Sequence, residues 1–338
     1  MATTKTVKEN ILLLGYGGRK NDIGLIQYFD TYDHFCAKYK STSSMAKAFK
    51  ILEDMKCTGI HVINLDPDDI NSYVDATQLI MQHEFNYIVP VDIYISNTYY
   101  DTTTCKNICL LDYIVKTMYG SNDSVLIGTD KHARLYEDID NYLDEMKTIE
   151  SLVKEYIGLR NHGENMVFVA NNLKDFDYAN VVLAGILLNT EVNTYPASDS
   201  FGEAIFDIDA VDIGSSSIVY FRGHDDRATT IENLINLNRK VEPKKIITIN
   251  RIIKYMLHDM DFSEFEGVFF TDHQKLLVKK KLIKYMDYYK GYILIDYDIS
   301  SVGFYETGPS VGIIVCKIDV WPISCSEKCT LEIQINNA

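Results

Sequence analysis

The sequence lacks the long apolar runs that membranes and secretion require. No segment approaches the roughly 20 apolar residues that a membrane-spanning helix needs. The first ten residues include two lysines, but no apolar run of secretory length follows them. The sequence therefore predicts a protein that is not inserted in a membrane and that is made and used in the cytosol.

A cysteine pattern for disulfide bonds or zinc is also missing. The seven cysteines are Cys36, Cys57, Cys105, Cys109, Cys316, Cys325 and Cys329. An odd number in a chain without a signal peptide argues against a disulfide framework. The pairs 105 with 109 and 325 with 329 do not have zinc-knuckle spacing, and no nearby histidine completes a set of four ligands. We expect reduced, mostly buried thiols and no bound metal.

Basic residues are scarce. Lys and Arg number 33 against 48 Asp and Glu, which gives a net charge of −15. Such a chain repels polyanions, so nucleic acid is not an expected partner. The hydrophobic fraction of 46% excludes a disordered chain, and 338 residues suffice for two or three packed units.

The pattern of apolar runs, turns and caps predicts three units. The first, residues 1–69, has expected strands at 10–14 and 24–29, helices at 31–39 and 44–56, and a strand at 61–65. The second, residues 86–227, has expected strands at 87–95, 124–128, 166–170 and 217–221 and helices at 108–119, 137–156 and 178–188. Its strands are continuously apolar, which is typical of parallel strands covered on both faces and predicts a doubly wound sheet.

The third unit, residues 228–338, is expected to be rich in strands. The pattern predicts a helix at 228–238, a strand at 246–249, a helix at 273–289 and strands at 292–297, 311–320 and 330–336. In the last strand Leu331, Ile333 and Ile335 alternate with Glu332 and Gln334, which predicts one buried and one wet face. The fold class is therefore α/β, α+β at the ends, with a doubly wound middle unit and a β-rich C-terminal unit.

Two motifs resemble enzyme sites without completing one. Gly15, Gly17 and Gly18 follow an apolar strand, but the next element is expected to be a strand rather than the helix of a dinucleotide fingerprint. A tight turn is the favoured interpretation. The residues His224, Asp225, Asp226 and Arg227 follow a strand, yet no nucleophile elbow or phosphate loop accompanies them. We expect no catalytic residue and no cofactor, and a nucleotide-using α/β enzyme stays an alternative.

One basic cluster stands out in this acidic chain. Lys279, Lys280, Lys281 and Lys284 share a predicted helix with Lys275 and an apolar stripe. They form either a solvated face or a contact with acidic neighbours, including other copies of the chain. Acidic candidates for that contact lie in the run from Asp138 to Glu145.

The order of these elements resembles that of contractile tail sheath proteins from phages, phage-tail-like bacteriocins and type VI-like injection systems. The first unit matches over residues 11–65. The C-terminal likeness consists of Gly267 to Phe270, a helix at 276–289, Gly291, strands at 292–297 and 315–320, Pro322, Glu327 and the strand at 331–335. The chain differs from the family in its short N-terminal arm and in lacking the protruding outer domains.

The resemblance implies a structural subunit that polymerises helically around an inner tube and contracts to drive it through a target envelope. The implied partners are other copies of the chain, the tube protein, and baseplate and tail-terminator proteins. The implied location is a virion tail or contractile particle assembled in the host bacterial cytoplasm. The terminal strand, Leu331 to Ile335, is expected to pair with a neighbouring subunit. A minor sheath-like protein of the baseplate or tail terminus stays open.

Overall fold

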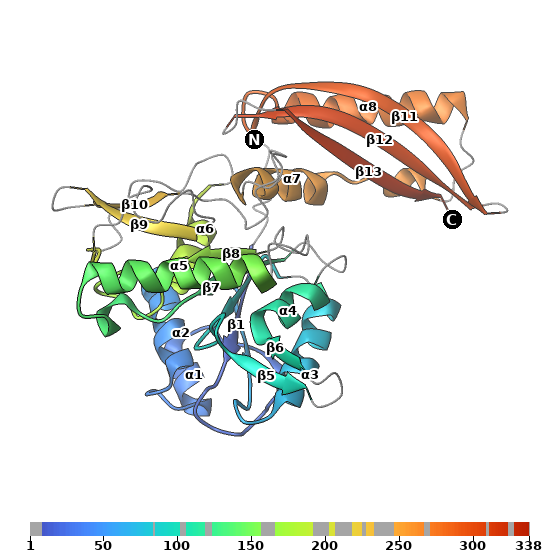
Figure 1. Ribbon diagram of the computed structural model, residues 1–338. Helices are drawn as coiled ribbons and strands as arrows, with labels where there is room; N and C mark the ends of the chain where they lie inside the picture. The colour runs from blue at the N-terminus through green and yellow to red at the C-terminus, as the bar shows by residue number, and fades with distance from the viewer. Residues whose placement is uncertain are drawn as a thin grey trace. The chain divides into compact units, whose positions relative to one another are not determined.

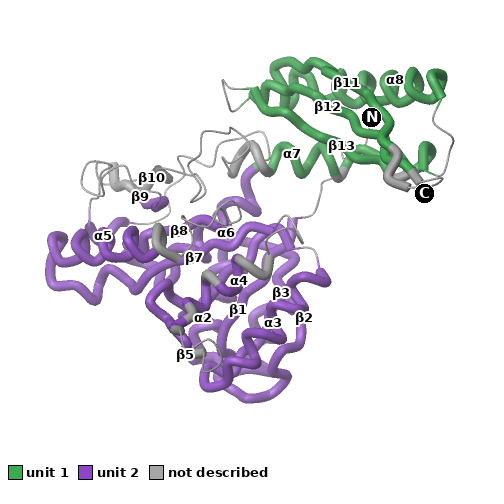
Figure 2. The backbone as a smooth tube through the Cα atoms, turned by 45° about the vertical axis from the view of Figure 1, so that its right-hand side comes forward, with its two compact units in different colours: residues 1–7, 191–195, 240–338 green, residues 8–190, 196–239 purple. Residues whose placement is uncertain are grey.

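The computed structural model divides into two compact units. It describes residues 9–83, 85–101, 106–118, 124–156, 166–191, 203–206, 218–224, 228–232, 247–266, 271–308, 311–323 and 328–337. The larger unit consists of Lys8–Thr190 and Pro196–Arg239, and the smaller one contains Lys240–Ala338 with Met1–Val7 and Glu191–Tyr195 (Figure 2).

The larger unit is built on one eight-stranded sheet with the order β10-β9-β8-β7-β4-β1-β3-β2. Its strands are β1 (Ile11–Gly15), β2 (Ile26–Tyr28), β3 (Ile60–Asn64), β4 (Tyr87–Pro90), β7 (Val125–Thr129), β8 (Met166–Val169), β9 (Ile218–His224) and β10 (Ala228–Glu232). The strands from β3 to β9 in this order run parallel, and β2 and β10 are antiparallel at the two edges.

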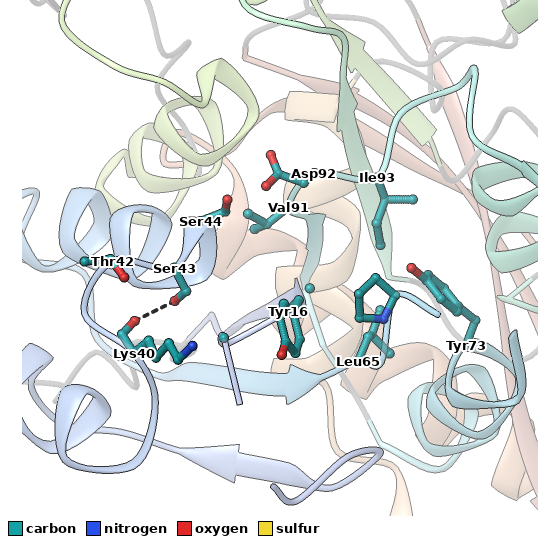
Figure 3. Close-up of a pocket in the computed structure, with 13 residues that line it drawn as sticks. Tyr16, Lys40, Thr42, Ser43, Ser44, Leu65, Tyr73, Val91, Asp92 and Ile93 are labelled. Carbon is teal, nitrogen blue, oxygen red and sulfur yellow. Dashed lines mark hydrogen bonds between the residues drawn. The ribbon is translucent and has the colours of Figure 1, made fainter. Parts of the chain in front are cut away.

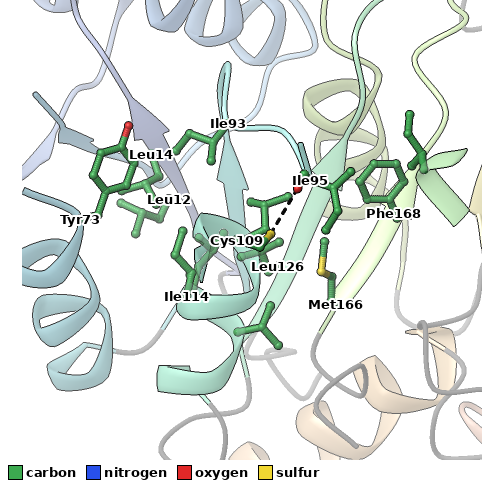
Figure 4. Packing of buried hydrophobic residues seen from close by; sticks show 14 of the residues in the cluster. Leu12, Leu14, Tyr73, Ile93, Ile95, Cys109, Ile114, Leu126, Met166 and Phe168 are labelled. Atoms are coloured by element: carbon green, nitrogen blue, oxygen red, sulfur yellow. Dashed lines mark hydrogen bonds between the residues drawn. The ribbon is translucent and has the colours of Figure 1, made fainter. Parts of the chain in front are cut away.

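Helices cover both faces of this sheet (Figure 1). One face packs against α3 (Ile70–Gln82), α4 (Leu110–Met118) and α5 (Ile139–Tyr156). In this core Leu12 and Leu14 of β1 pack with Leu126 of β7 and Ile114 of α4 (Figure 4). The other face packs against α1 (Tyr32–Lys38), α2 (Ser44–Asp54) and α6 (Ala179–Asn189), which bury Phe35, Phe49 and Leu183 respectively. The doubly wound α/β architecture predicted from the apolar strands is confirmed.

The boundary expected between residues 69 and 86 differs from the structure. β1 pairs with β3 on one side and β4 on the other, so the first two expected units share one sheet. The connection between β3 and β4 is α3, a helix that the sequence reading left unassigned. Asp69 caps it by accepting a hydrogen bond from the backbone N–H of Asn71 at 3.0 Å. A short hairpin, β5 (Thr98–Asp101) and β6 (Lys106–Cys109), also precedes α4.

The smaller unit has a three-stranded antiparallel sheet with helices on one face. The order is β11 (Leu294–Gly308), β12 (Val311–Pro322), β13 (Cys329–Asn337), and the helices are α7 (Ile247–Asp259) and α8 (Asp272–Tyr289). The pairing of β11 with β12 shifts register in three places, whereas that of β12 with β13 is continuous. The β-rich C-terminal unit is therefore confirmed, and its last strand lies at an edge.

Two elements expected in the C-terminal unit are wrong. Residues 228–232 form strand β10 and not the start of a helix, because Thr229, Thr230 and Ile231 extend along the edge of the larger sheet. The strand expected at 246–249 is replaced by the first turn of α7. Its isoleucines favour a strand locally, but Ile252 and Met256, one helical turn apart, are buried in the core. Residues 233–246 lie outside the described part of the chain.

Asn64 fixes the glycine turn that follows β1. Its side chain is fully buried, and its Oδ1 accepts a hydrogen bond from the backbone N–H of Gly17 at 2.8 Å. Its Nδ2 donates to the carbonyl oxygens of Arg19 at 2.8 Å and Asn21 at 2.7 Å. One side chain thus supplies the hydrogen bonds of a turn that has no regular backbone pairing of its own.

The variant Asn64→Ala is expected to lower the free energy of unfolding by about 2 kcal/mol, because it leaves the buried Gly17 amide without a partner. Urea denaturation of the full chain measures this loss. Asn71→Ala, which removes an exposed amide that bonds only to Asp69 in the described structure, is the matched control and is expected to change stability by less than about 0.5 kcal/mol. Equal effects of the two variants would contradict the role of Asn64.

Candidate interaction surfaces

Strand β13 buries one face in the core of its own unit. Leu331, Ile333 and Ile335 are 4%, 8% and 3% exposed and pack with the helices, while Glu332 and Gln334 lie on the wet face. Ile333 lies opposite Cys316 of β12 in a continuous antiparallel register. The predicted alternation of buried and wet residues is therefore confirmed.

The pairing of β13 modifies the role expected for this strand. In the described residues β13 pairs with β12 of the same chain and completes its own sheet. Its other edge has no strand partner within the described part of the chain. Contact of Leu331 to Ile335 with a neighbouring subunit stays a prediction, and the available route is this second edge rather than transfer of the strand.

The variant Ile333→Ala is expected to lower the free energy of unfolding by about 2 to 3 kcal/mol, because it removes buried methyl groups from the core of the smaller unit. Gln334→Ala, one residue along on the wet face, is the matched control and is expected to have almost no effect. Thermal and urea denaturation of both variants measures the difference. A neutral Ile333→Ala would mean that β13 does not pack on its own chain in solution.

The lysines of α8 fall into two groups. Lys279, Lys280 and Lys284 are exposed and have no ion-pair partner among the described residues. Lys281 is different, because its ammonium group lies 3.0 Å from the Glu264 carboxylate and 5.6 Å from the ring centroids of Phe262 and Phe265. The structure therefore uses Lys281 within its own fold, whereas the sequence left all four lysines between a solvated face and a contact with acidic neighbours.

Apolar side chains share the exposed face of α8 with the lysines. Leu276, Ile283 and Tyr288 are 58%, 37% and 48% exposed. Leu276 and Ile283 lie seven residues apart on either side of Lys280, which places them on the lysine side of the helix and outside its buried apolar stripe. Apolar residues interspersed with cations on one helix face are typical of a surface that contacts an acidic partner.

The triple variant Lys279→Glu, Lys280→Glu, Lys284→Glu is expected to weaken self-assembly and to leave the melting temperature nearly unchanged, because exposed charges contribute little to stability. Lys281→Glu is expected to do the opposite and to destabilise the fold by about 1 kcal/mol, since it places a carboxylate beside Glu264 and removes the contacts with the two rings. Sedimentation measures the amount of assembled material and thermal melts measure the stability of the fold, so together they distinguish the two effects. Unchanged assembly of the triple variant would mean a merely solvated face.

The glycine turn borders a pocket of about 300 Å³ at the carboxyl ends of β1, β3 and β4 (Figure 3). Two backbone amides beside the pocket are already used: the Gly17 amide donates to Asn64, and the Ala46 amide at the start of α2 donates to Ser43 Oγ at 3.1 Å. The Asp92 carboxylate and the Lys40 ammonium group both belong to residues that line the pocket, so its charge does not select an anion. The element after the turn is strand β2, as predicted, so the geometry favours a structural turn over a phosphate site.

The remaining sequence candidates do not form a site among the described residues. His224 ends β9, and Asp225, Asp226 and Arg227 lie outside the described part of the chain. Cys105 and Cys325 also lie outside it, and the described Cys36, Cys57, Cys109, Cys316 and Cys329 are free thiols. Within the described ranges, no three His, Cys, Asp or Glu side chains group closely enough to hold a metal ion. No helix in those ranges is long and apolar enough to span a membrane.

Several solved structures share this fold. The sheath tail protein of Desulfitobacterium hafniense superposes with a TM-score of 0.65 at 12% identity, over 99% of this chain and 98% of that one. A chain of the anti-feeding prophage baseplate superposes with a TM-score of 0.60 at 12% identity, over 98% of this chain and 90% of that one. A third match is a chain of the PVC sheath complex, from an extracellular contractile injection system in its contracted state. It superposes with a TM-score of 0.61 at 13% identity, over 93% of this chain and 88% of that one. No family model and no curated protein matches the sequence.

The fold of the chain is therefore that of contractile tail sheath proteins, as the resemblance implied. The match with the Desulfitobacterium protein covers nearly the whole of both chains.

Proposed function

We propose that this chain is a structural subunit of a contractile tail sheath, which polymerises helically around an inner tube and contracts to drive the tube through a target envelope. The observation that carries the proposal is the full-length match of both units, in one order, to a sheath tail protein. The role is structural and not catalytic. The Gly17 amide supports this view, because it donates to Asn64 and a turn that binds phosphate needs its amides free.

The smaller unit has the features that an open polymer requires. The second edge of β13 offers backbone N–H and C=O groups to an added strand, and α8 offers a cationic and apolar face. An edge and a helix face are different surfaces, so contacts through them are heterologous, and heterologous contacts that do not close build helical filaments. The inter-subunit role of Leu331 to Ile335 belongs to this proposal.

The proposed partners follow from this role. They are other copies of the chain, the tube protein, and the proteins of the baseplate and tail terminus, in a virion tail or contractile particle assembled in a bacterial cytoplasm. Nucleic acid is not a proposed partner, because the net charge of −15 repels a polyanion.

A second candidate function is that of a minor sheath-like protein at the baseplate. It is favoured by the match to a chain of the anti-feeding prophage baseplate over 98% of this chain. Such a protein forms one closed ring and does not extend into a tube. The two functions therefore differ in the assembly that the purified chain forms.

Negative-stain microscopy of the purified full chain tests the proposed function. Sheath subunits are expected to form tubes or stacked rings, because each added copy presents the same surfaces to the next one. Single rings of one size would favour the baseplate role. Uniform small particles at high concentration and low salt would contradict both and would favour the enzyme.

A further inference from the structure

Asp130 is a buried carboxyl group at the carboxyl edge of the larger sheet. It directly follows β7 and is 2% exposed. Its Oδ1 accepts a hydrogen bond from the backbone N–H of Asn171 at 2.8 Å, and Asn171 Nδ2 donates back to the Asp130 carbonyl oxygen at 3.2 Å. The loops that follow the neighbouring strands β7 and β8 are thereby joined. The second carboxyl oxygen, Oδ2, has no hydrogen-bond partner among the described residues.

Asn171 extends this connection to the start of α6. Its Oδ1 accepts a hydrogen bond from the Ala179 amide at 3.0 Å, and its Nδ2 donates to the Asp177 carbonyl oxygen at 2.9 Å. The Ala133 amide donates to the Asn171 carbonyl oxygen at 2.8 Å. A change at Asp130 therefore acts on the ends of two strands and on the helix that follows them.

Helix α5 places Tyr142 beside this carboxyl group. Tyr142 is fully buried, and the centroid of its ring lies 5.3 Å from that of Tyr136 and 5.6 Å from that of Phe206. Its hydroxyl group interacts with Asp130. The Tyr142 hydroxyl also lacks a hydrogen-bond partner of good geometry within the described structure. One of these buried oxygens lies on the β7 loop and the other on α5, and buried polar atoms without a partner are costly.

No cation is among the main groups that shift the pKa of Asp130. On the same loop, burial lowers the pKa of His132, and the Arg134 guanidinium group pairs with the Asp177 carboxylate at 3.0 Å. The other titratable groups that interact with Asp130 are Tyr142 and Glu145 of α5, Tyr136 just before that helix, and Tyr94 in the loop after β4. Burial, with the negative charge of Glu145 adding to it, raises the pKa of Asp130 to about 8. Burial also raises the pKa values of Tyr142 and Tyr136, the latter to about 12, so both tyrosines are neutral wherever Asp130 titrates.

We propose that Asp130 is a proton-dependent latch that holds α5 against the carboxyl edge of the sheet. In the closed state the carboxyl group is neutral, its Oδ2–H donates to the Tyr142 hydroxyl oxygen, and its Oδ1 keeps the bond from the Asn171 amide. When the proton leaves to solvent, a carboxylate without a cation is left in the core, and the packing of α5 on the β7 and β8 loops loosens to admit water.

The direction of the pH dependence follows from the raised pKa. An unfolded aspartate has a pKa of about 3.9, so the folded chain binds an extra proton between about pH 4 and pH 8. The stability that this proton contributes is fully present below about pH 4 and is lost as the pH rises through about 8. The latch is therefore closed in acid and near neutrality and opens in alkali.

Hydrogen exchange of the α5 amides in the full-length chain tests the latch. After correction for the intrinsic rate, exchange in the first half of α5 is expected to be about 10-fold faster at pH 9 than at pH 6 in the unmodified chain, as protection tracks local opening. Asp130→Asn keeps a neutral donor in place and is expected to remove this pH dependence. Asp144→Asn, at an exposed position on the same helix, is the matched control and is expected to retain it. Equal pH dependence in the unmodified chain and in Asp130→Asn would overturn the proposal.

A measurement on the unmodified chain keeps the test decisive if Asp130→Asn does not fold. Among the described aspartates with a shifted pKa, Asp130 alone is shifted upward. With ¹³C-labelled aspartate, infrared spectra are expected to show a protonated carboxyl band that persists at pH 6 and disappears with a midpoint near pH 8. Absence of the band at pH 6, in folded protein, would overturn the proposal.

Discussion

The architecture of the larger unit follows from one constraint: neither face of its parallel sheet can be exposed to water. All five residues of β1 and all five of β7 are buried, so helices must cover both sides of the sheet. This cover brings α3, α4 and α5 to one face and α1, α2 and α6 to the other. Polar chemistry is then confined to the strand ends, where Asn64 and Asn171 supply the hydrogen bonds that the turns cannot make for themselves.

The smaller unit obeys the opposite constraint, because its antiparallel sheet needs helices on one side only. The wet side carries ion pairs across the strands, such as Lys317 with Glu332 at 3.4 Å, and Lys328 with Asp319 at 2.9 Å. These pairs neutralise charge within one chain. The exposed Lys279, Lys280 and Lys284 of α8 have no such partner in the described structure, so an acidic neighbour can pair with them.

Side-chain patterns predicted burial well and pairing poorly. The alternation at Leu331, Ile333 and Ile335 correctly gave a half-buried strand, but backbone hydrogen bonds leave no trace in side-chain identity, so the pattern did not reveal that β13 joins β12 of the same chain. Local preference also misled at the start of α7, where β-branched residues favour a strand and tertiary packing selects a helix. Lys281 could not be told from its neighbours, because its partner Glu264 is 17 positions away in the sequence and is brought near only by the fold. The burial of Asp130 was missed for the same reason.

The two outer strands of the smaller sheet are unequal. The register shifts along β11 mark irregularities that bend and twist a strand and interrupt its row of backbone groups, which is how natural sheets blunt an edge against unwanted pairing. β13 pairs in unbroken register and keeps a regular outer edge. A sheet with one blunted and one regular edge has a direction, so strands can be added to it from one side only. In the proposed sheath, growth by such additions is polar, and the two ends of the assembly are chemically distinct, one carrying an open acceptor edge and the other not.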